Sequence, residues 1–193
     1  MAAYQLPPLP QPLAVFDHTT ARQTQTLVIK EKLLDNFDIK DLNGAPWMRV
    51  EAKLATVRGR KKFFDSRGGY LFDITKEPLH LHTTFSLKDQ NKREIMEVKS
   101  NFSPTFTTAQ GRAVSLTMKG NWLDTSADIV EDTTGAVAAR IDRKVFNARE
   151  ALLGQQTYHL TVAPGVDVAL LVAMCICLDE KQNEGQGGTC SIL

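Results

Sequence analysis

Two short basic segments carry the residues best suited to bind a negatively charged ligand. The first is Arg58-Gly59-Arg60-Lys61-Lys62, and the second consists of Lys88, Lys92 and Arg93. Basic side chains can pair with phosphates, and near an anionic membrane each contributes about 1 kcal/mol. Both segments are predicted to lie in loops, and the alternative is a solvated role that only aids solubility. If the two loops meet, they form one face for lipid headgroups.

The last four residues, Cys190-Ser191-Ile192-Leu193, fit the C-a-a-X pattern for prenylation, and the final leucine favours a geranylgeranyl group. The preceding residues 182–189 are polar and contain glycine, as expected of a flexible tail that presents the thiol to a transferase. Stable anchoring usually takes two membrane signals, and the basic loops would supply the second. The alternative is a disordered end that carries an unmodified cysteine.

Metal and catalytic sites are not indicated. His80 and His82 alternate along a predicted strand, but a zinc site needs three or four convergent ligands. The sequence contains no nucleophile elbow, no phosphate-binding loop and no dinucleotide-binding glycine motif. Asp167 is interpreted as a charge at a helix N-terminus, where the dipole favours it. We therefore expect a non-enzymatic protein without cofactor or metal.

The composition is that of one globular domain. The chain has 193 residues, of which 42% are hydrophobic and 23% charged, and a net charge of +1. This balance gives no global attraction to nucleic acid, so binding must come from a local patch. Three cysteines offer no paired disulfide framework, and the N-terminus lacks a signal peptide. We expect a cytoplasmic monomer that binds no nucleic acid.

A repeated turn organises the chain. Asp41-Leu42-Asn43-Gly44, Asp65-Ser66-Arg67-Gly68 and Asp132-Thr133-Thr134-Gly135 each place Asp at the first and Gly at the fourth position of a type I turn. Short segments with a period of two flank these turns, which indicates half-buried strands. Further candidate strands bring the total to about a dozen, at the spacing of a sandwich or barrel. They are residues 26–30, 79–87, 94–99, 113–119 and 156–162.

One segment breaks this pattern. Residues 168–178 are apolar throughout, with no polar stripe. As a helix the segment would be about 16 Å long, too short to span a bilayer, and a helix that is apolar all round is buried. We predict a core helix surrounded by sheet, with a fully buried strand as the alternative. The expected organisation is a proline-rich arm over residues 1–12, a domain over 13–181 and a tail over 182–193.

The order of these features resembles the LURP-one-related family. The resemblance rests on the segment 27–34, on the turns at Asp41 and Asp65, and on Gly165-Val166-Asp167 ahead of the apolar helix. It implies a Tubby-like fold, a closed antiparallel barrel of about twelve strands around a central hydrophobic C-terminal helix. Related Tubby domains bind phosphoinositides, and related phospholipid scramblases act at membranes.

The leading hypothesis is a non-enzymatic module that acts at a membrane surface through phosphoinositide or other acidic phospholipid headgroups. The second is a protein-interaction scaffold in a stress or defence response, with an unidentified partner. The third is scramblase-like lipid transport, which a helix enclosed by a barrel disfavours.

Overall fold

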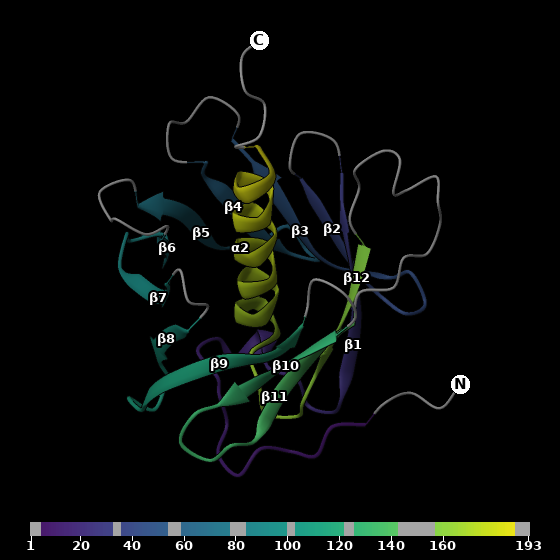
Figure 1. Cartoon of the computed structure of the whole chain (residues 1–193), viewed down its shortest axis with the longest axis vertical. Coiled ribbons are helices and arrows are strands. Elements are labelled where there is room, and N and C mark those ends of the chain that lie inside the picture. The colour runs from purple at the N-terminus through teal and green to yellow at the C-terminus, as the bar shows by residue number, and fades with distance from the viewer. Residues whose placement is uncertain are drawn as a thin grey trace.

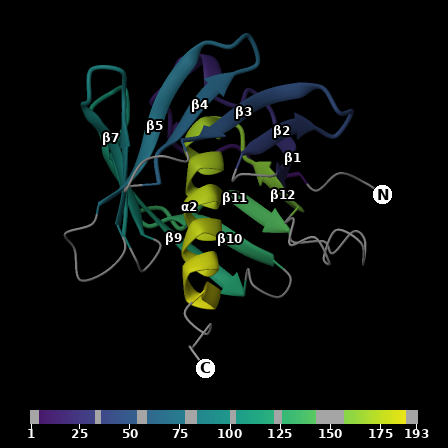
Figure 2. The same ribbon diagram turned by 90° about the horizontal axis from the view of Figure 1, so that it is seen from above.

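The computed structural model describes residues 5–32, 36–53, 59–77, 84–99, 103–121, 126–142 and 157–187, without the side chains of residue 121 and residues 182–187. Twelve strands form a closed antiparallel barrel around one long helix (Figure 1, Figure 2). The predicted fold class is confirmed. The elements are η1 (Asp17–Thr19), β1 (Gln25–Glu31), β2 (Phe37–Asp41), β3 (Pro46–Ala52), β4 (Lys61–Asp65), β5 (Tyr70–Glu77), β6 (Thr84–Lys88), β7 (Glu94–Val98), β8 (Pro104–Thr107), β9 (Ala113–Asn121), β10 (Ser126–Glu131), β11 (Val137–Asp142), β12 (Thr157–Val162) and α2 (Val168–Gly187).

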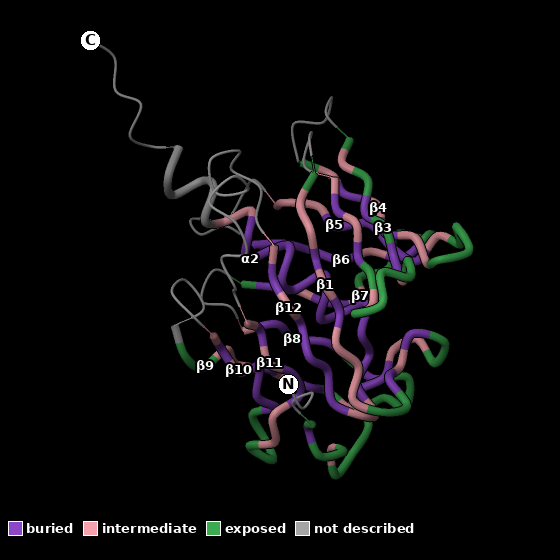
Figure 3. The backbone as a smooth tube through the Cα atoms, turned by 90° about the vertical axis from the view of Figure 1, so that its right-hand side faces the viewer, coloured by how far each residue is buried: buried purple, intermediate pink, exposed green. Residues whose placement is uncertain are grey.

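The barrel closes between its first and last strands. Each strand pairs with the next along the chain, and β1 pairs with β12 with Ile29 opposite Tyr158. Ile29 and Tyr158 are both fully buried, since alternate residues of each strand face the interior. The buried positions lie along the strands and the helix, while exposed positions concentrate at the hairpin turns (Figure 3).

The helix α2 fills the barrel. Every residue from Val168 to Leu178 is at most 2% exposed, which confirms the predicted core helix and excludes the buried strand. The helix continues to Gly187, so that residues 182–187, predicted as tail, are helical. No proline interrupts the chain after Leu178, and the helix can therefore extend beyond the apolar segment. Among the described residues, no helix combines the length and apolarity needed to cross a bilayer.

Two of the three predicted aspartate turns are confirmed. The Oδ1 atom of Asp41 accepts hydrogen bonds from the N–H groups of Asn43 (2.9 Å) and Ala45 (2.8 Å), and Asp65 makes the equivalent pair. The third turn is organised by Glu131 and not by Asp132. The strand β10 runs through Glu131, whose carbonyl accepts from the N–H of Gly135 at 2.8 Å.

One aspartate turn is not predicted by the sequence pattern. The Oδ1 atom of Asp89 accepts from the N–H groups of Asn91 (2.8 Å) and Arg93 (2.9 Å), which makes the β6–β7 hairpin turn equivalent to those at Asp41 and Asp65. The turn lacks the glycine that the pattern requires, because Lys92 occupies that position with φ of 64°. Strand β8 is also missed, since it is short and begins with a proline.

The chain ahead of β1 covers the end of the barrel where α2 begins. The N–H of Leu13 donates to the carbonyl of Gly165 (2.8 Å), and the N–H of Asp167 donates back to the carbonyl of Leu13 (3.0 Å). The Oδ2 atom of Asp167 accepts from the N–H groups of Phe16 (2.7 Å) and Val15 (3.2 Å). Asp167 thus joins the helix start to the N-terminal segment.

Candidate anion-binding site

The two predicted basic segments meet at one buried carboxylate. Asp73 lies on β5, and its Oδ2 atom pairs with the guanidinium of Arg60, which immediately precedes β4. The same oxygen lies 3.4 Å from the Nζ atom of Lys92, in the turn that follows β6. Because β4 and β6 both pair with β5, residues far apart in the sequence converge here.

Strand register places this site on the outer surface of the barrel. Lys62 on β4 lies directly opposite Asp73, and Asp73 lies opposite Lys88 on β6. The adjacent residues Phe63 and Phe72 stack inside the barrel, with ring centroids 4.6 Å apart. Neighbouring residues of a strand face opposite sides, so Lys62 and Asp73 face outward. The Asp73 side chain is nonetheless only 2% exposed.

Like charges crowd Lys62. The pKa of Lys62 is lowered from its ordinary value, chiefly by the positive charge of Lys53, then by burial and by the charges of Arg60 and Lys92, with Glu51 opposing. We call Lys53, Arg60, Lys62 and Lys92 the basic cluster. A lowered lysine pKa reports a positive local potential, which favours the approach of an anion.

Lys53 is a member of the cluster that sequence reasoning misses. It follows β3, and its N–H donates to the carbonyl of Arg60 at 2.9 Å across the β3–β4 hairpin. The basic segment that follows is predicted as a loop, which hides the pairing of β3 with β4. An alignment of these two strands as a hairpin would have placed Lys53 beside Arg60.

Aromatic side chains border the basic cluster. The rings of Phe64 and Tyr70 meet edge to face with centroids 6.0 Å apart. The Nζ atom of Lys62 lies 5.7 Å from the Tyr70 ring centroid, and the Arg49 guanidinium lies 4.9 Å from that of Phe64. Burial raises the pKa of Tyr70, while the charge of Arg60 opposes the increase. The outer face thus places cations beside aromatic rings.

Lys61 does not join this surface. The sequence predicts a loop for Lys61, whereas β4 begins at this residue, and strand alternation turns it inward. Its Nζ atom lies 2.6 Å from Oε1 of Glu180 on α2 and 5.5 Å from the ring centroid of Phe37. Lys61 is 3% exposed, so it connects the barrel wall to the helix.

The other predicted site residues either pair with acidic side chains or lie outside the described residues. Lys88 pairs with Glu77 at 2.9 Å, and Arg93 pairs with Asp89 at 3.2 Å while staying largely exposed. Arg58 and Cys190 lie outside the described residues, as do His80 and His82. Of the seven predicted headgroup ligands, the structure therefore brings Arg60, Lys62 and Lys92 together.

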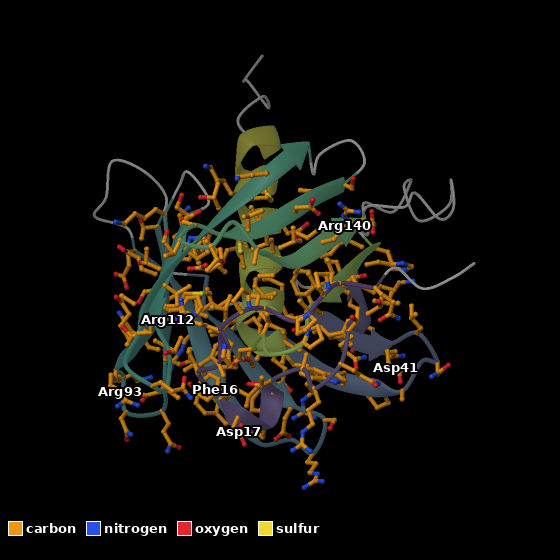
Figure 4. All side chains as sticks on the ribbon, turned by 90° about the horizontal axis from the view of Figure 1, so that it is seen from below. Phe16, Asp17, Asp41, Arg93, Arg112 and Arg140 are labelled. Carbon is orange, nitrogen blue, oxygen red and sulfur yellow. The ribbon has the colours of Figure 1, made fainter. Side chains whose placement is uncertain are left out.

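A groove of about 1000 Å³ adjoins the same β6–β7 turn. It lies between that turn, the β8–β9 turn and the N-terminal segment, with Phe16, Ile95 and Phe106 among its apolar lining. Thr105, Ser115 and Thr133 contribute hydroxyl groups to the lining, and Arg93 and Glu97 contribute charged side chains. Viewed from below, Phe16, Arg93 and Arg112 lie on the same side of the molecule (Figure 4).

The helix cysteines are not suited to chemistry. Cys175 and Cys177 are fully buried, and burial raises the pKa of each thiol, so the reactive thiolate is disfavoured. Among the described residues, no group of three or more His, Cys, Asp or Glu side chains could hold a metal ion.

Known proteins resemble this chain over most of its length. A family model described as LURP-one-related matches residues 25–179. Protein LURP-one-related 10 of Arabidopsis thaliana is 22% identical in an alignment of 164 residues that covers 77% of this chain and 84% of that protein. Protein LURP-one-related 15 of the same plant is 20% identical in an alignment of 162 residues that covers 77% of this chain and 74% of that protein.

One solved structure shares the fold. It is an X-ray structure of an Arabidopsis thaliana protein, with a TM-score of 0.61 and 17% sequence identity. The match covers 89% of this chain and 99% of that one.

Proposed function

The chain belongs to the LURP-one-related family, and from this premise we propose that it is a non-enzymatic module that binds acidic phospholipid headgroups at a membrane surface through the basic cluster. The observation that carries the proposal is the convergence of Arg60 and Lys92 on Asp73, beside Lys62. The lowered pKa of Lys62, despite the opposing charge of Glu51, supports a positive potential at this part of the outer face.

The backbone of Lys92 supports a functional role for its side chain. Gly44 and Gly68 occupy the equivalent positions of the Asp41 and Asp65 turns, with φ of 84° and 83°. A lysine at φ of 64° costs about 1–2 kcal/mol relative to glycine. Residues held in strained conformations cluster at functional sites. Lys92 thus supplies a charge at the expense of an unfavourable turn.

Flotation with vesicles of neutral lipid, and of neutral lipid mixed with acidic phospholipid or phosphoinositide, tests the proposal. We expect binding to the acidic vesicles only, and a decline in binding with added salt. The double variant Lys62→Gln/Lys92→Gly removes two cations, and its binding should fall roughly 30-fold, since each contributes about 1 kcal/mol. Lys92→Gly alone should also raise the thermal unfolding temperature, because glycine relieves the turn.

A matched control distinguishes the basic cluster from net charge. Lys119→Gln/Arg22→Gln removes the same number of charges from exposed positions on β9 and ahead of β1. Its binding should fall far less than that of the cluster variant. Equal binding of the wild-type protein to neutral and acidic vesicles would contradict the proposal, as would equal losses in the two double variants.

The lipid expected on Cys190 stays a prediction and would add a second membrane signal. The intact mass of the protein from its native cells measures it directly. Loss of the last three residues together with the gain of a geranylgeranyl group is the expected result. An unmodified mass would leave headgroup binding as the sole membrane contact.

The groove beside the β6–β7 turn favours a protein-interaction scaffold as the second candidate function. Its size, about 1000 Å³, and its mixture of apolar and hydroxyl groups suit an extended segment of a partner. Ile95→Arg would place a charge in the lining. The test is recovery of a stoichiometric protein partner from the native cells. If Ile95→Arg loses this partner while Lys62→Gln/Lys92→Gly retains it, the protein is better described as a scaffold.

A further inference from the structure

We propose that Asp73 is a positioning residue, which holds Arg60 and Lys92 in place so that the basic cluster exists. The inference rests on the proposed function and deepens it. The Oδ2 atom of Asp73 pairs with a cation 13 residues earlier in the chain and with another 19 residues later. Two segments with no strand pairing between them are thereby joined at one oxygen.

The contacts of Asp73 are poorly suited to stabilising the fold. Its Oδ1 atom is buried and has no hydrogen-bond partner within the part of the chain that the structure describes. The side chain of Lys92 is 62% exposed, so water screens its charge, whereas that of Arg60 is 29% exposed and keeps its Nε atom buried. A buried carboxylate that leaves one oxygen without a partner among the described residues and pairs with a largely exposed lysine contributes little to stability, which leaves room for a role in positioning.

The location of Asp73 explains the convergence of like charges. Arg60 and Lys92 share one oxygen and must therefore lie close to each other, which is unfavourable without a negative charge between them. Without that charge, the exposed Lys92 side chain is free to turn into solvent, and the guanidinium of Arg60 loses its ion pair with Asp73. The cluster would then disperse.

Vesicle binding by Asp73→Asn distinguishes a positioning role from a simple counter-ion role, because the two roles predict opposite changes. Asp73→Asn increases the net charge by one, so a mere counter-ion role predicts tighter binding to acidic vesicles, by roughly fivefold. Positioning predicts the reverse, a loss of up to roughly 30-fold, because two cations leave the surface. Asp132→Asn is the matched control, since it adds the same charge at an exposed turn residue and should weaken binding in neither case.

The pKa of Lys62 gives a readout that needs no lipid. In protein with labelled lysines, NMR titration should show the lowered pKa of Lys62 moving back toward its ordinary value in Asp73→Asn, since Arg60 and Lys92 no longer crowd it. If both cations stay in place, the loss of a nearby negative charge lowers the pKa of Lys62 further. That result would overturn the proposal.

The remaining outcomes are equally decisive. Failure of Asp73→Asn to fold would contradict the proposal, because Asp73 is assigned no role in stability. If wild-type protein binds no acidic vesicle while the Lys62 titration behaves as expected, the headgroup function fails and the positioning role stands. If the wild type binds and Asp73→Asn binds more tightly, the positioning role fails alone.

Discussion

Two buried aspartates illustrate two different uses of a carboxylate in this barrel. Asp167 and Asp73 are 0% and 1% exposed. Asp167 accepts hydrogen bonds from uncharged donors, namely the N–H groups of Val15, Phe16 and Ala169 and the hydroxyl of Thr19 at 2.7 Å. Asp73 pairs with two cations that reach into solvent, and one of its oxygens has no partner among the described residues.

The two carboxylates differ in what happens to the groups that they bind when the carboxylate is removed. Three of the donors around Asp167 are backbone N–H groups that cannot leave, so its removal leaves them unsatisfied in the interior. Of the cations around Asp73, Lys92 is largely exposed and can turn into water, and Arg60 is partly exposed, so removal of Asp73 leaves fewer buried groups unsatisfied. Asp167 therefore holds the end of the barrel together, and Asp73 shapes the charge of its outer face.

The largest effect should come from Asp167→Ala. The substitution removes the acceptor of the helix start and of the N-terminal segment, and we expect a loss of about 3 kcal/mol or more in the free energy of unfolding. Chemical denaturation measures it. Burial raises the pKa of Asp167 despite these donors, so part of the stabilisation is offset by the cost of burying the charge. A change below 1 kcal/mol would remove the contrast with Asp73.

An intermediate effect is expected at the Lys61–Glu180 pair, where only one partner is deeply buried. The side chain of Lys61 is 4% exposed and that of Glu180 is 27% exposed. Glu180→Gln removes the carboxylate that pairs with a buried cation and should cost about 2 kcal/mol, whereas Lys61→Met replaces the cation with an apolar side chain of similar length and should cost much less. Thermal unfolding of the two variants tests this asymmetry. Equal losses of thermal stability in the two variants would show that the deeper burial of Lys61 does not determine the cost of removing its partner.

The smallest effect concerns Glu131, which is 1% exposed and accepts from the N–H of Thr134 at 2.8 Å. Burial opposes ionisation, but hydrogen bonds from Thr134 and Thr133 outweigh it and lower the pKa of Glu131. A lowered carboxyl pKa stabilises the folded state above the unfolded pKa, and this is lost as the pH falls through the folded pKa. Glu131→Gln should therefore cost about 1 kcal/mol at pH 7 and less at about pH 3. A difference that grows in acid would refute this sign.

Local patterns within the sequence determined most of the fold. The turns at Asp41 and Asp65, the period-two segments and the apolar stretch from residue 168 each depend on neighbouring residues, and each lies where it was predicted. The turn at Asp89 was missed because Lys92 replaces the expected glycine. Strand β8 was missed because four residues that begin with proline carry too short a pattern.

The site depended on contacts that no local pattern contains. The sequence identified Arg60, Lys62 and Lys92 as basic residues, but it could not show that β5 lies between their strands or that Asp73 joins them. It also could not separate Lys61 from Lys62, since the direction of each side chain depends on where β4 begins. Residue types and turn chemistry act over a few residues and were readable in advance. Which charges meet is decided by strand order and register, and only the closed barrel sets these.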